Sequence, residues 1–370
     1  MTVAMPGGID PVEYTAPMPD YAMLDDTQTE SLAGFDLIID VRSPGEYAED
    51  HLPGAINLPV LSDDERVRVG TVYKQISTFD ARREGAALVT RNIGHHLETE
   101  LAGLPKKSRL LLYCWRGGMR SRSMALVLSA VGWKISLLRG GYRTWRREVV
   151  AQLEHSDAPL PFILIDGQTG TAKTAILHQL AARGAQVLDL EGLALHRGSA
   201  FGDFAATPQP SQKRFETLIW EGLRGMDLTR PVYVEAESNM VGRRQLPARI
   251  WAAMKAAPRI AIAAPIAARA EYLVEAYPDL VSDTAKLNAS LDQLASRHAK
   301  TLIARWRELH SVGQFRELAA ELISAHYDAA YNRAREHRED EPVLILRSEA
   351  LDAAGIGALA AAILEAGIKP

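Results

Sequence analysis

The sequence of 370 residues contains a single cysteine, Cys114. One cysteine excludes an intramolecular disulfide framework and is typical of a protein that works in a reducing compartment. No stretch approaches the roughly 20 apolar residues that a membrane-spanning helix needs. Residues 1–10 also lack the basic start and apolar centre of a secretory signal. We therefore expect a cytoplasmic protein that has no membrane partner.

Acidic residues are missing from positions 101–147, whereas the first hundred positions hold eighteen of them against seven basic residues. The net charge of −4 therefore conceals a strong asymmetry. A basic block of this kind favours a polyanionic partner, above all a nucleic acid. The alternative is a solvated basic face that the acidic segment balances. The basic residues of the block are Lys106, Lys107, Arg109, Arg116, Arg120, Arg122, Lys134, Arg139, Arg143, Arg146 and Arg147.

Cys114 ends an apolar run and is followed by a short loop that is rich in glycine and arginine. This order predicts a strand, a tight loop and a helix, with Ser121 as the candidate N-cap. Helix N–H groups and arginines stabilise a thiolate, and Gly117 and Gly118 allow an anion-binding nest of N–H groups. We interpret Cys114 as the catalytic thiol; the alternative is a buried cysteine that behaves as a small hydrophobe. The predicted anion site comprises Trp115, Arg116, Gly117, Gly118, Met119 and Arg120.

The length of the chain predicts two or three domains. We place a first domain at residues 1–150, a linker at 151–161 and a second domain at 162–370. The first domain is expected to contain an irregular lead-in at 1–30 and a helix at 81–104. Short apolar strands and helices are expected in both domains, which gives the α/β fold class.

The second domain opens with an apolar strand at 162–166 that runs into a candidate phosphate-binding P-loop, and a helix at 175–183 follows. Its N–H groups and Lys173 would bind phosphates, and Thr174 could reach a metal ion such as Mg²⁺. Ala172 replaces the last glycine of the pattern G-x-x-x-x-G-K-[ST], and its methyl group is tolerable if φ is negative. Whether the loop hydrolyses a nucleotide stays open. The predicted loop is Gly167, Gln168, Thr169, Gly170, Thr171, Ala172, Lys173 and Thr174.

Acidic residues follow two further apolar segments, at 187–191 and 232–238. Glu235 and Glu237 resemble the acid that P-loop proteins present to a metal ion or to water, and a plain strand end is the alternative. Residues 285–336 are expected to be mostly helical. We predict a last strand at 343–346, a last helix at 349–367 and no dedicated metal site.

The first domain resembles the rhodanese fold over residues 20–150. The resemblance is carried by Asp40–Val41–Arg42, the segment 51–57, the Cys114 loop and Leu138–Arg139–Gly140–Gly141, in that order. In rhodaneses the loop cysteine carries a persulfide that backbone N–H groups surround. Five residues separate Cys114 from Arg120, where many rhodaneses have four, and the longer spacing also occurs in rhodanese-like phosphatases.

The whole chain resembles the tRNA 2-selenouridine synthase family, which joins a rhodanese-like domain to a P-loop NTPase-like domain with a helical C-terminal part. The most specific segment is Tyr113–Cys114–Trp115–Arg116–Gly117–Gly118–Met119–Arg120–Ser121. Tyr73–Lys74–Gln75, residues 85–89, the end of the 235–238 segment and His326–Tyr327–Asp328 extend the match. Ala172 and Ala329 stand where the family usually has glycine and proline.

The resemblance implies that sulfur in the wobble 2-thiouridine of tRNA is replaced by selenium. The implied co-substrates are geranyl diphosphate, which gives an S-geranyl intermediate, and selenophosphate, which is supplied by a selenophosphate synthetase. No tightly bound cofactor is implied. Cys114 is expected to be the selenium carrier, as a perselenide, or a nucleophile. Arg139, Arg143, Arg146 and Arg147 are expected to bind tRNA phosphates.

Two other functions remain open at this point. A rhodanese-type sulfurtransferase or phosphatase fused to a nucleotide-binding domain would turn over ATP without tRNA. A tRNA-binding adaptor without catalysis would be unaffected by Cys114→Ala.

Overall fold

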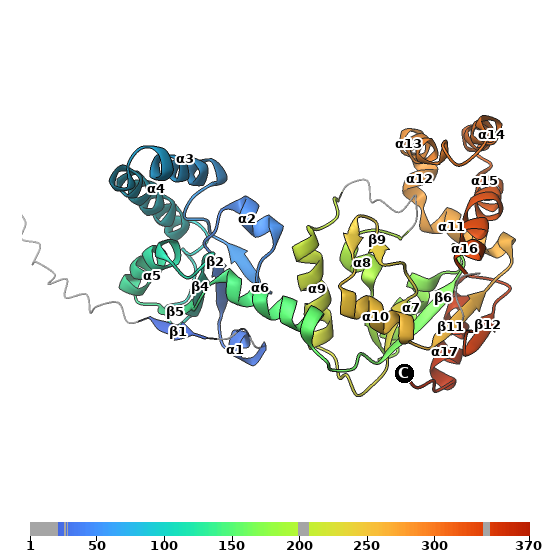
Figure 1. Ribbon diagram of the computed structural model, residues 1–370, viewed down its shortest axis with the longest axis horizontal. Helices are drawn as coiled ribbons and strands as arrows, with labels where there is room; N and C mark the ends of the chain where they lie inside the picture. Colours follow the sequence, from blue (N-terminus) through green and yellow to red (C-terminus); the bar gives the residue numbers. More distant parts are fainter. Residues whose placement is uncertain (1–20, 26, 28, 199–206, 336–340) are drawn as a thin grey trace, which may run out of the picture. The chain divides into compact units, whose positions relative to one another are not determined.

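The computed structural model describes residues 21–25, 27, 29–198, 207–335 and 341–370. Two compact units, residues 1–148 and 149–370, divide the chain (Figure 1). Each unit contains a parallel sheet with helices packed on it, so the expected α/β class is confirmed. Much of the irregular lead-in expected at 1–30 lies outside the described residues. No helix in the described part of the chain has both the length and the apolar character of a membrane span.

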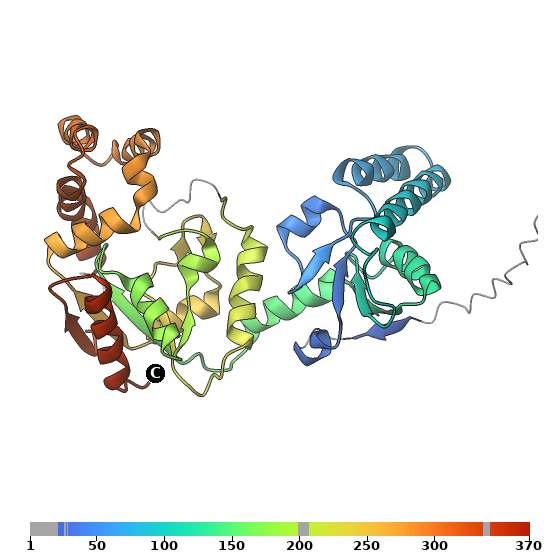
Figure 2. The same cartoon turned by 180° about the vertical axis from the view of Figure 1, so that it is seen from behind.

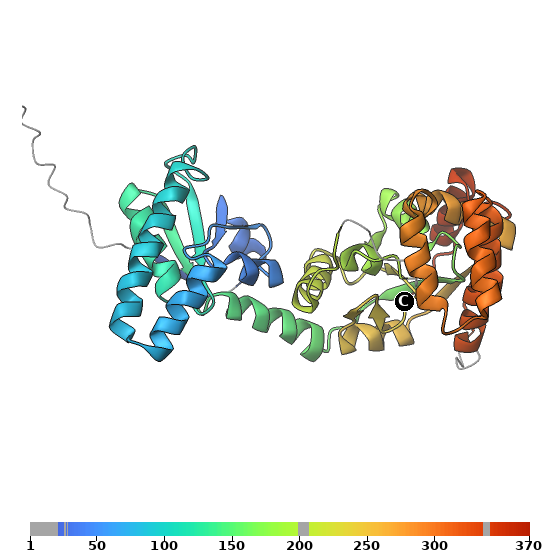
Figure 3. The ribbon, with the colours of Figure 1, turned by 90° about the horizontal axis from the view of Figure 1, so that it is seen from above.

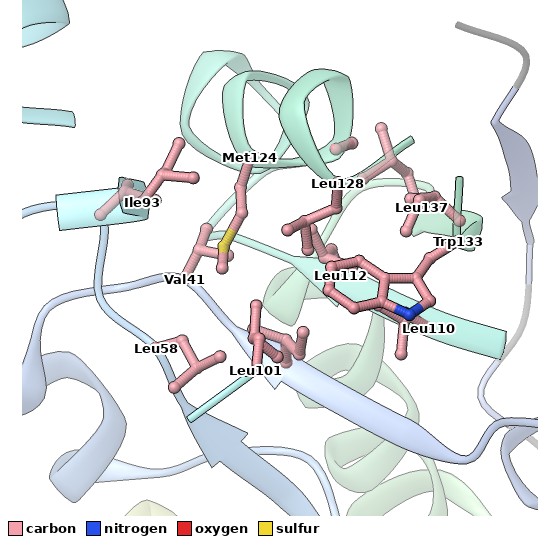
Figure 4. Packing of buried hydrophobic residues seen from close by; sticks show 14 of the residues in the cluster. Val41, Leu58, Ile93, Leu101, Leu110, Leu112, Met124, Leu128, Trp133 and Leu137 are labelled. Carbon is pink, nitrogen blue, oxygen red and sulfur yellow. The ribbon is translucent and has the colours of Figure 1, made fainter. Parts of the chain in front are cut away.

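The first unit is built on a five-stranded parallel sheet in the order β1-β5-β4-β2-β3. Leu110 and Leu112 on β4 pack against Ile93, Met124 and Leu128 of the covering helices (Figure 4). Leu111 points to the opposite face and is also fully buried, as expected for a parallel strand covered on both sides. The strands are β1 (Ala22–Leu24), β2 (Leu37–Asp40), β3 (Ala55–Asn57), β4 (Arg109–Tyr113) and β5 (Lys134–Leu138).

The helix predicted at 81–104 has different bounds in the structure. A helix was expected at 81–104, but α4 begins at Thr78 because the Ser77 hydroxyl caps it, and it ends at Glu98. A separate helix, α3, precedes it and packs beside it. The helices are α1 (Thr29–Ala33), α2 (Pro44–Glu49), α3 (Asp63–Gln75), α4 (Thr78–Glu98), α5 (Met119–Val131) and α6 (Tyr142–Val150).

Helical structure continues beyond α6 as the π-helical turn η1 (Ala151–His155). The segment 151–161, expected to be a linker, is therefore helical in its first part and becomes irregular after His155. Pro159 and Pro161 cannot donate backbone hydrogen bonds, which favours the irregular conformation of the second part.

The second unit contains a second parallel sheet, in the order β12-β11-β6-β8-β7. Figure 2 shows α7 and α17 side by side on one face of this sheet. A small antiparallel hairpin, β9–β10, lies outside it. The elements are β6 (Phe162–Gly167), α7 (Lys173–Ala182), β7 (Gln186–Leu188), α8 (Leu190–Ala194), α9 (Gln212–Arg224), β8 (Val232–Glu235), β9 (Met240–Val241), β10 (Arg244–Gln245), α10 (Ala248–Ala256), β11 (Arg259–Ala263), β12 (Leu344–Arg347) and α17 (Ala353–Glu365).

A group of helices completes the second unit between β11 and β12. Their apolar faces form a core of their own around Trp306, which is fully buried. Helices α13, α14 and α15 stand next to one another (Figure 3). The helices are α11 (Ile266–Ala276), α12 (Pro278–Ser282), α13 (Thr284–Leu294), α14 (Lys300–Ser311), α15 (Phe315–Leu322), η2 (Ile323–Tyr327) and α16 (Asp328–Arg335).

Candidate functional site

Cys114 directly follows β4 and lies at the start of the loop that leads into α5. Its sulfur accepts hydrogen bonds from the Gly118 N–H at 3.1 Å and from the Ser121 hydroxyl at 3.3 Å. Burial opposes ionisation, but hydrogen bonds from Ser121 and from the N–H groups of Arg116 and Gly118 outweigh it and lower the pKa of the thiol. These hydrogen-bond donors therefore stabilise the thiolate form of Cys114.

The N-cap of α5 is Gly118, and Ser121 lies one turn inside the helix. The prediction of Ser121 as N-cap is therefore wrong. Its hydroxyl is fully buried and donates to Cys114 instead of capping a backbone N–H.

The turn at Gly140–Gly141 supports the Cys114 loop from the side of β5. Gly141 has a φ of +63°, and a Cβ there would lie 2.7 Å from the Gly117 nitrogen and closer still to the Cys114 carbonyl oxygen. The Tyr142 N–H donates to that carbonyl at 2.8 Å. Only glycine allows the two segments to approach so closely.

The two arginines of the loop have different environments. Arg116 is exposed, whereas the Arg120 guanidinium pairs with Glu46, with Nη1 and Oε2 2.7 Å apart. Burial of Glu46 is outweighed by its hydrogen bond and charge interaction with Arg120, so the pKa of this carboxyl is lowered. Met119 is 71% exposed at the mouth of the loop, and the ring of Trp115 lies against Tyr142.

A buried ion pair lies close to the same loop. Arg42 is 1% exposed and donates to the Asp40 carboxylate at 2.6 Å and to the Asp50 carbonyl oxygen at 2.6 Å. Its guanidinium carbon also lies 4.1 Å from the centre of the Tyr142 ring. Arg42 therefore joins β2 to the residue whose N–H holds the Cys114 carbonyl.

The four arginines that were predicted to bind tRNA lie next to one another in the first unit. Arg139 precedes α6 and pairs with Asp25. Arg143, Arg146 and Arg147 lie on α6 at spacings of three and four residues, so they share one side of the helix. Arg143 and Arg147 are exposed to solvent.

The predicted P-loop connects β6 to α7. Lys173 Nζ donates to the Gly167 carbonyl oxygen at 2.9 Å, and the Thr171 hydroxyl donates to the Gln168 carbonyl at 2.8 Å. Ala172 has a φ of +59°, although a negative value was the condition for accepting a methyl group here. This left-handed conformation costs a non-glycine residue about 1–2 kcal/mol. The Ala172 methyl group compensates in part, because it packs in the core beneath the loop.

Most of the predicted loop lines one pocket, which we call the P-loop pocket. Gly167, Thr169, Gly170, Thr171, Ala172, Lys173 and Thr174 contribute to its wall, together with Glu237. Gln168 and Glu235 do not line it.

Acidic side chains, among them Glu191 and Glu237, also line the P-loop pocket. The Thr174 hydroxyl donates to Glu191 at 2.9 Å, and the Glu191 N–H donates to Glu235 at 2.7 Å. Burial and the neighbouring Glu191 raise the pKa of Glu237 to about 8. Burial also raises the pKa of Glu235, which lies below the pocket surface. Sequence reasoning did not select Glu191, although the acidic end of the 187–191 segment was the signal.

Arg269 is a second residue that sequence reasoning missed. Its buried guanidinium donates to the Thr169 carbonyl oxygen at 2.7 Å and to Asp328 at 2.6 Å. Tyr331 donates to Asp166 at 3.2 Å. The helical region is thus bonded to the residue before the P-loop and to the first part of the loop.

An apolar pocket adjoins the P-loop pocket. Helices α11 to α15 supply most of its wall. Four residues line both pockets: Thr169, Leu273, Tyr277 and Tyr327. The remaining wall of the apolar pocket includes Val274, Leu280, Leu287, Phe315, Leu318 and Leu322. The P-loop pocket and the apolar pocket therefore adjoin each other.

Among the described residues, no group of three or more His, Cys, Asp or Glu side chains is placed to hold a metal ion. A smaller pair of oxygen-bearing side chains, the Thr174 hydroxyl and the Glu191 carboxylate, does lie together in the P-loop pocket.

Comparison with protein families matches residues 21–148 to the rhodanese-like domain and residues 160–307 to the tRNA 2-selenouridine synthase AAA domain. The expected order of a rhodanese-like and a P-loop-type domain is thereby confirmed.

Several curated relatives carry the name tRNA 2-selenouridine synthase. The one from Bdellovibrio bacteriovorus is 33% identical over 78% of this chain and 80% of its own length. The one from Nitrosomonas europaea is 36% identical over 65% of this chain and 63% of its own length. The one from Marinobacter nauticus is 37% identical over 60% of each chain. The match thus spans less than two thirds of the last two relatives.

Proposed function

Because this chain belongs to the tRNA 2-selenouridine synthase family, we propose that it replaces sulfur by selenium in the wobble 2-thiouridine of tRNA. The reaction has two steps. Geranyl diphosphate first alkylates the sulfur, and selenophosphate then displaces the geranylated sulfur. Alkylation is needed because the unmodified sulfur is a poor leaving group, whereas the geranylated sulfur can leave as a thiolate.

The observation that carries the first step is the junction of the two pockets in the second unit. A prenyl diphosphate has an anionic head and a hydrocarbon tail, and the P-loop pocket adjoins the apolar pocket at four residues that line both: Thr169, Leu273, Tyr277 and Tyr327. Lys173 and the loop N–H groups would bind the diphosphate. The tail would lie among the side chains of α11 to α15, where burial of each CH₂ stabilises binding by about 0.8 kcal/mol.

In this step the thiocarbonyl sulfur attacks C1 of the geranyl group, the C–O bond breaks, and diphosphate leaves with the electron pair. The base loses its N3 proton at the same time. This proton passes to solvent, because Glu237, whose pKa is about 8, already holds a proton at neutral pH. Mg²⁺ would fit between the diphosphate, Thr174 and Glu191, because this ion usually takes one or two protein ligands along with phosphate oxygens and water.

In the second step selenium of selenophosphate adds to C2 of the base, and geranylthiolate leaves. The P–Se bond of the product must then break so that selenium keeps the electron pair. We assign this cleavage to Cys114: its thiolate attacks phosphorus, and water later hydrolyses the phosphocysteine to phosphate and thiol. A perselenide on Cys114 would instead require phosphorus to leave as phosphite, which is a change in the oxidation state of phosphorus. Attack of the thiolate on phosphorus needs no such change, so we favour the role of nucleophile.

The geometry at Cys114 supports this role. The N–H groups of Arg116 and Gly118 lie by the sulfur, and Arg116 is exposed next to them, so a phosphoryl group would meet donors and a positive charge. The basic side chains of α6 would hold tRNA phosphates, and an anticodon loop allows a single base to splay out toward the site.

The full-length protein should be incubated with 2-thiouridine tRNA, geranyl diphosphate and selenophosphate, followed by mass spectrometry of the nucleosides. The expected product is 2-selenouridine. Lys173→Ala should prevent geranylation but still convert tRNA that already carries S-geranyl-2-thiouridine. Cys114→Ala should leave the geranylated or the Se-phosphorylated nucleoside and no 2-selenouridine.

Equal loss of both steps in Lys173→Ala would contradict the division between the two sites. Turnover of ATP without tRNA would support the sulfurtransferase or phosphatase alternative instead. An unchanged product in Cys114→Ala would exclude any role of the thiol.

A further inference from the structure

The apolar pocket has a second neighbour on the side that does not face the P-loop pocket. This outer pocket is lined by Val274, Gly313, Gln314, Phe315, Arg316 and Glu317. It shares Val274 and Phe315 with the apolar pocket and shares no lining residue with the P-loop pocket. The three spaces therefore follow one another, and the side chains of Phe315 and Val274 form the wall between the last two.

The position of Phe315 is determined by the turn between α14 and α15. Gly313 adopts a φ of +75°, and the Gln314 N–H donates to the Leu309 carbonyl oxygen at 2.8 Å. These features end α14 and place Phe315 at the first position of α15. The backbone therefore leaves Phe315 little freedom to move away from the pocket.

His310, which also lines the apolar pocket, contacts the aromatic ring of Phe315. The two rings meet edge to face with their centres 5.3 Å apart. His310 is 6% exposed, and its Nε2 lies 3.2 Å from the Leu280 carbonyl oxygen, which anchors the imidazole. The contact with His310 therefore stabilises the position of the Phe315 ring between the apolar pocket and the outer pocket.

We propose that Phe315 determines the length of the prenyl tail that the pocket accepts. This inference rests on the proposed function, since it concerns the donor of the first step. With the ring present, a tail that starts at the P-loop ends at Phe315. Without the ring, the apolar and outer pockets become continuous, and a tail with one more isoprene unit can extend into the added space.

The test compares geranyl and farnesyl diphosphate as donors to 2-thiouridine tRNA, with the full-length protein. Phe315→Ala should raise the ratio of kcat/KM for farnesyl over geranyl by about tenfold or more, since even one methylene group changes selectivity by roughly 10- to 200-fold. Phe315→Leu should give a smaller increase. Val312→Ala is the matched control, because Val312 lies in the same turn, is 62% exposed and lines none of the three pockets.

Phe315→Trp provides a test in the opposite direction. The larger ring should shorten the space and shift the preference from geranyl toward dimethylallyl diphosphate. Calorimetric titration of each variant with the free diphosphates supplies a readout that does not depend on turnover. Circular dichroism shows whether each variant folds.

The outcomes separate this inference from the function on which it rests. If the wild-type protein geranylates tRNA but the Phe315 variants keep its donor ratio, Phe315 does not determine the length. If the wild-type protein neither binds nor uses any prenyl diphosphate, the proposed first step is wrong.

Discussion

The Arg120 guanidinium and the Glu46 carboxylate form an ion pair beside the Cys114 loop, with Nη1 and Oε2 2.7 Å apart. Glu46 also accepts a hydrogen bond from the Ser43 N–H and pairs with Arg66 on α3. The carboxylate therefore joins three segments of the first unit. Arg120 is two residues from Gly118, whose N–H bonds to the Cys114 sulfur. Glu46 is consequently a positioning residue for the loop.

We predict that Glu46→Gln lowers kcat/KM for conversion of S-geranyl-tRNA to 2-selenouridine by about tenfold, which corresponds to ~1.4 kcal/mol. Geranylation should remain at the parental rate, because that step belongs to the second unit. Glu84→Gln is the matched control, since Glu84 on α4 is also partly buried and also pairs with an arginine, Arg68 on α3. Equal loss of both steps in Glu46→Gln would point to unfolding rather than positioning.

The Cys114 loop and the P-loop could be predicted from local sequence, but their distant partners could not. The order of apolar run, Cys114 and glycines is a local pattern, and the strand, loop and helix follow from it. The partners Glu46 and Arg269 act over 74 positions and over 100 positions of sequence, respectively. No local pattern encodes such a contact, because it depends on how the sheet brings distant loops together.

Ala172 gives a second example of this limit. Its backbone conformation depends on the shape of the P-loop, which surrounding contacts impose against the preference of the residue. From the sequence we could state only that a methyl group requires a negative φ here, and the structure shows a φ of +59°.

We predict that Ala172→Gly changes the free energy of unfolding by less than about 1 kcal/mol. Relief of the left-handed strain contributes about 1–2 kcal/mol, while the lost buried methyl group and the freer unfolded chain together cost a similar amount. Ala172→Val should destabilise the protein by about 2 kcal/mol or more, because a β-branched residue rarely adopts this conformation. Urea denaturation of both variants measures the difference. A large stabilisation by glycine would show that the methyl group contributes little.

The raised pKa of Glu237 predicts a pH-dependent stability. The folded protein holds the proton up to about pH 8, whereas an ordinary carboxyl releases it near 4.5. Between these values the folded state binds more protons than the unfolded state, so the contribution of Glu237 to stability is lost as the pH rises. Glu237→Gln should flatten the decline of Tm between pH 5 and pH 8. Parallel Tm profiles for the two proteins would contradict the raised pKa.

The last prediction concerns the three arginines of α6 and the affinity for tRNA. If Arg143, Arg146 and Arg147 contact phosphates, the logarithm of the affinity should fall linearly with the logarithm of the salt concentration. Each arginine that is replaced by alanine should reduce this slope by about one unit, because one fewer counterion is released.

The matched control for this series is Arg83→Ala. Arg83 is exposed on α4 of the same unit and pairs with Asp80, so its loss removes the same formal charge from a different surface. A long-range effect of net charge would change the slope equally for Arg83→Ala and for any single arginine variant of α6. Direct contact with tRNA phosphates would change the slope only in the α6 variants. Filter binding at several salt concentrations with 2-thiouridine tRNA measures the slope. If the triple variant of α6 and Arg83→Ala have the same slope as the parent, tRNA does not bind this helix.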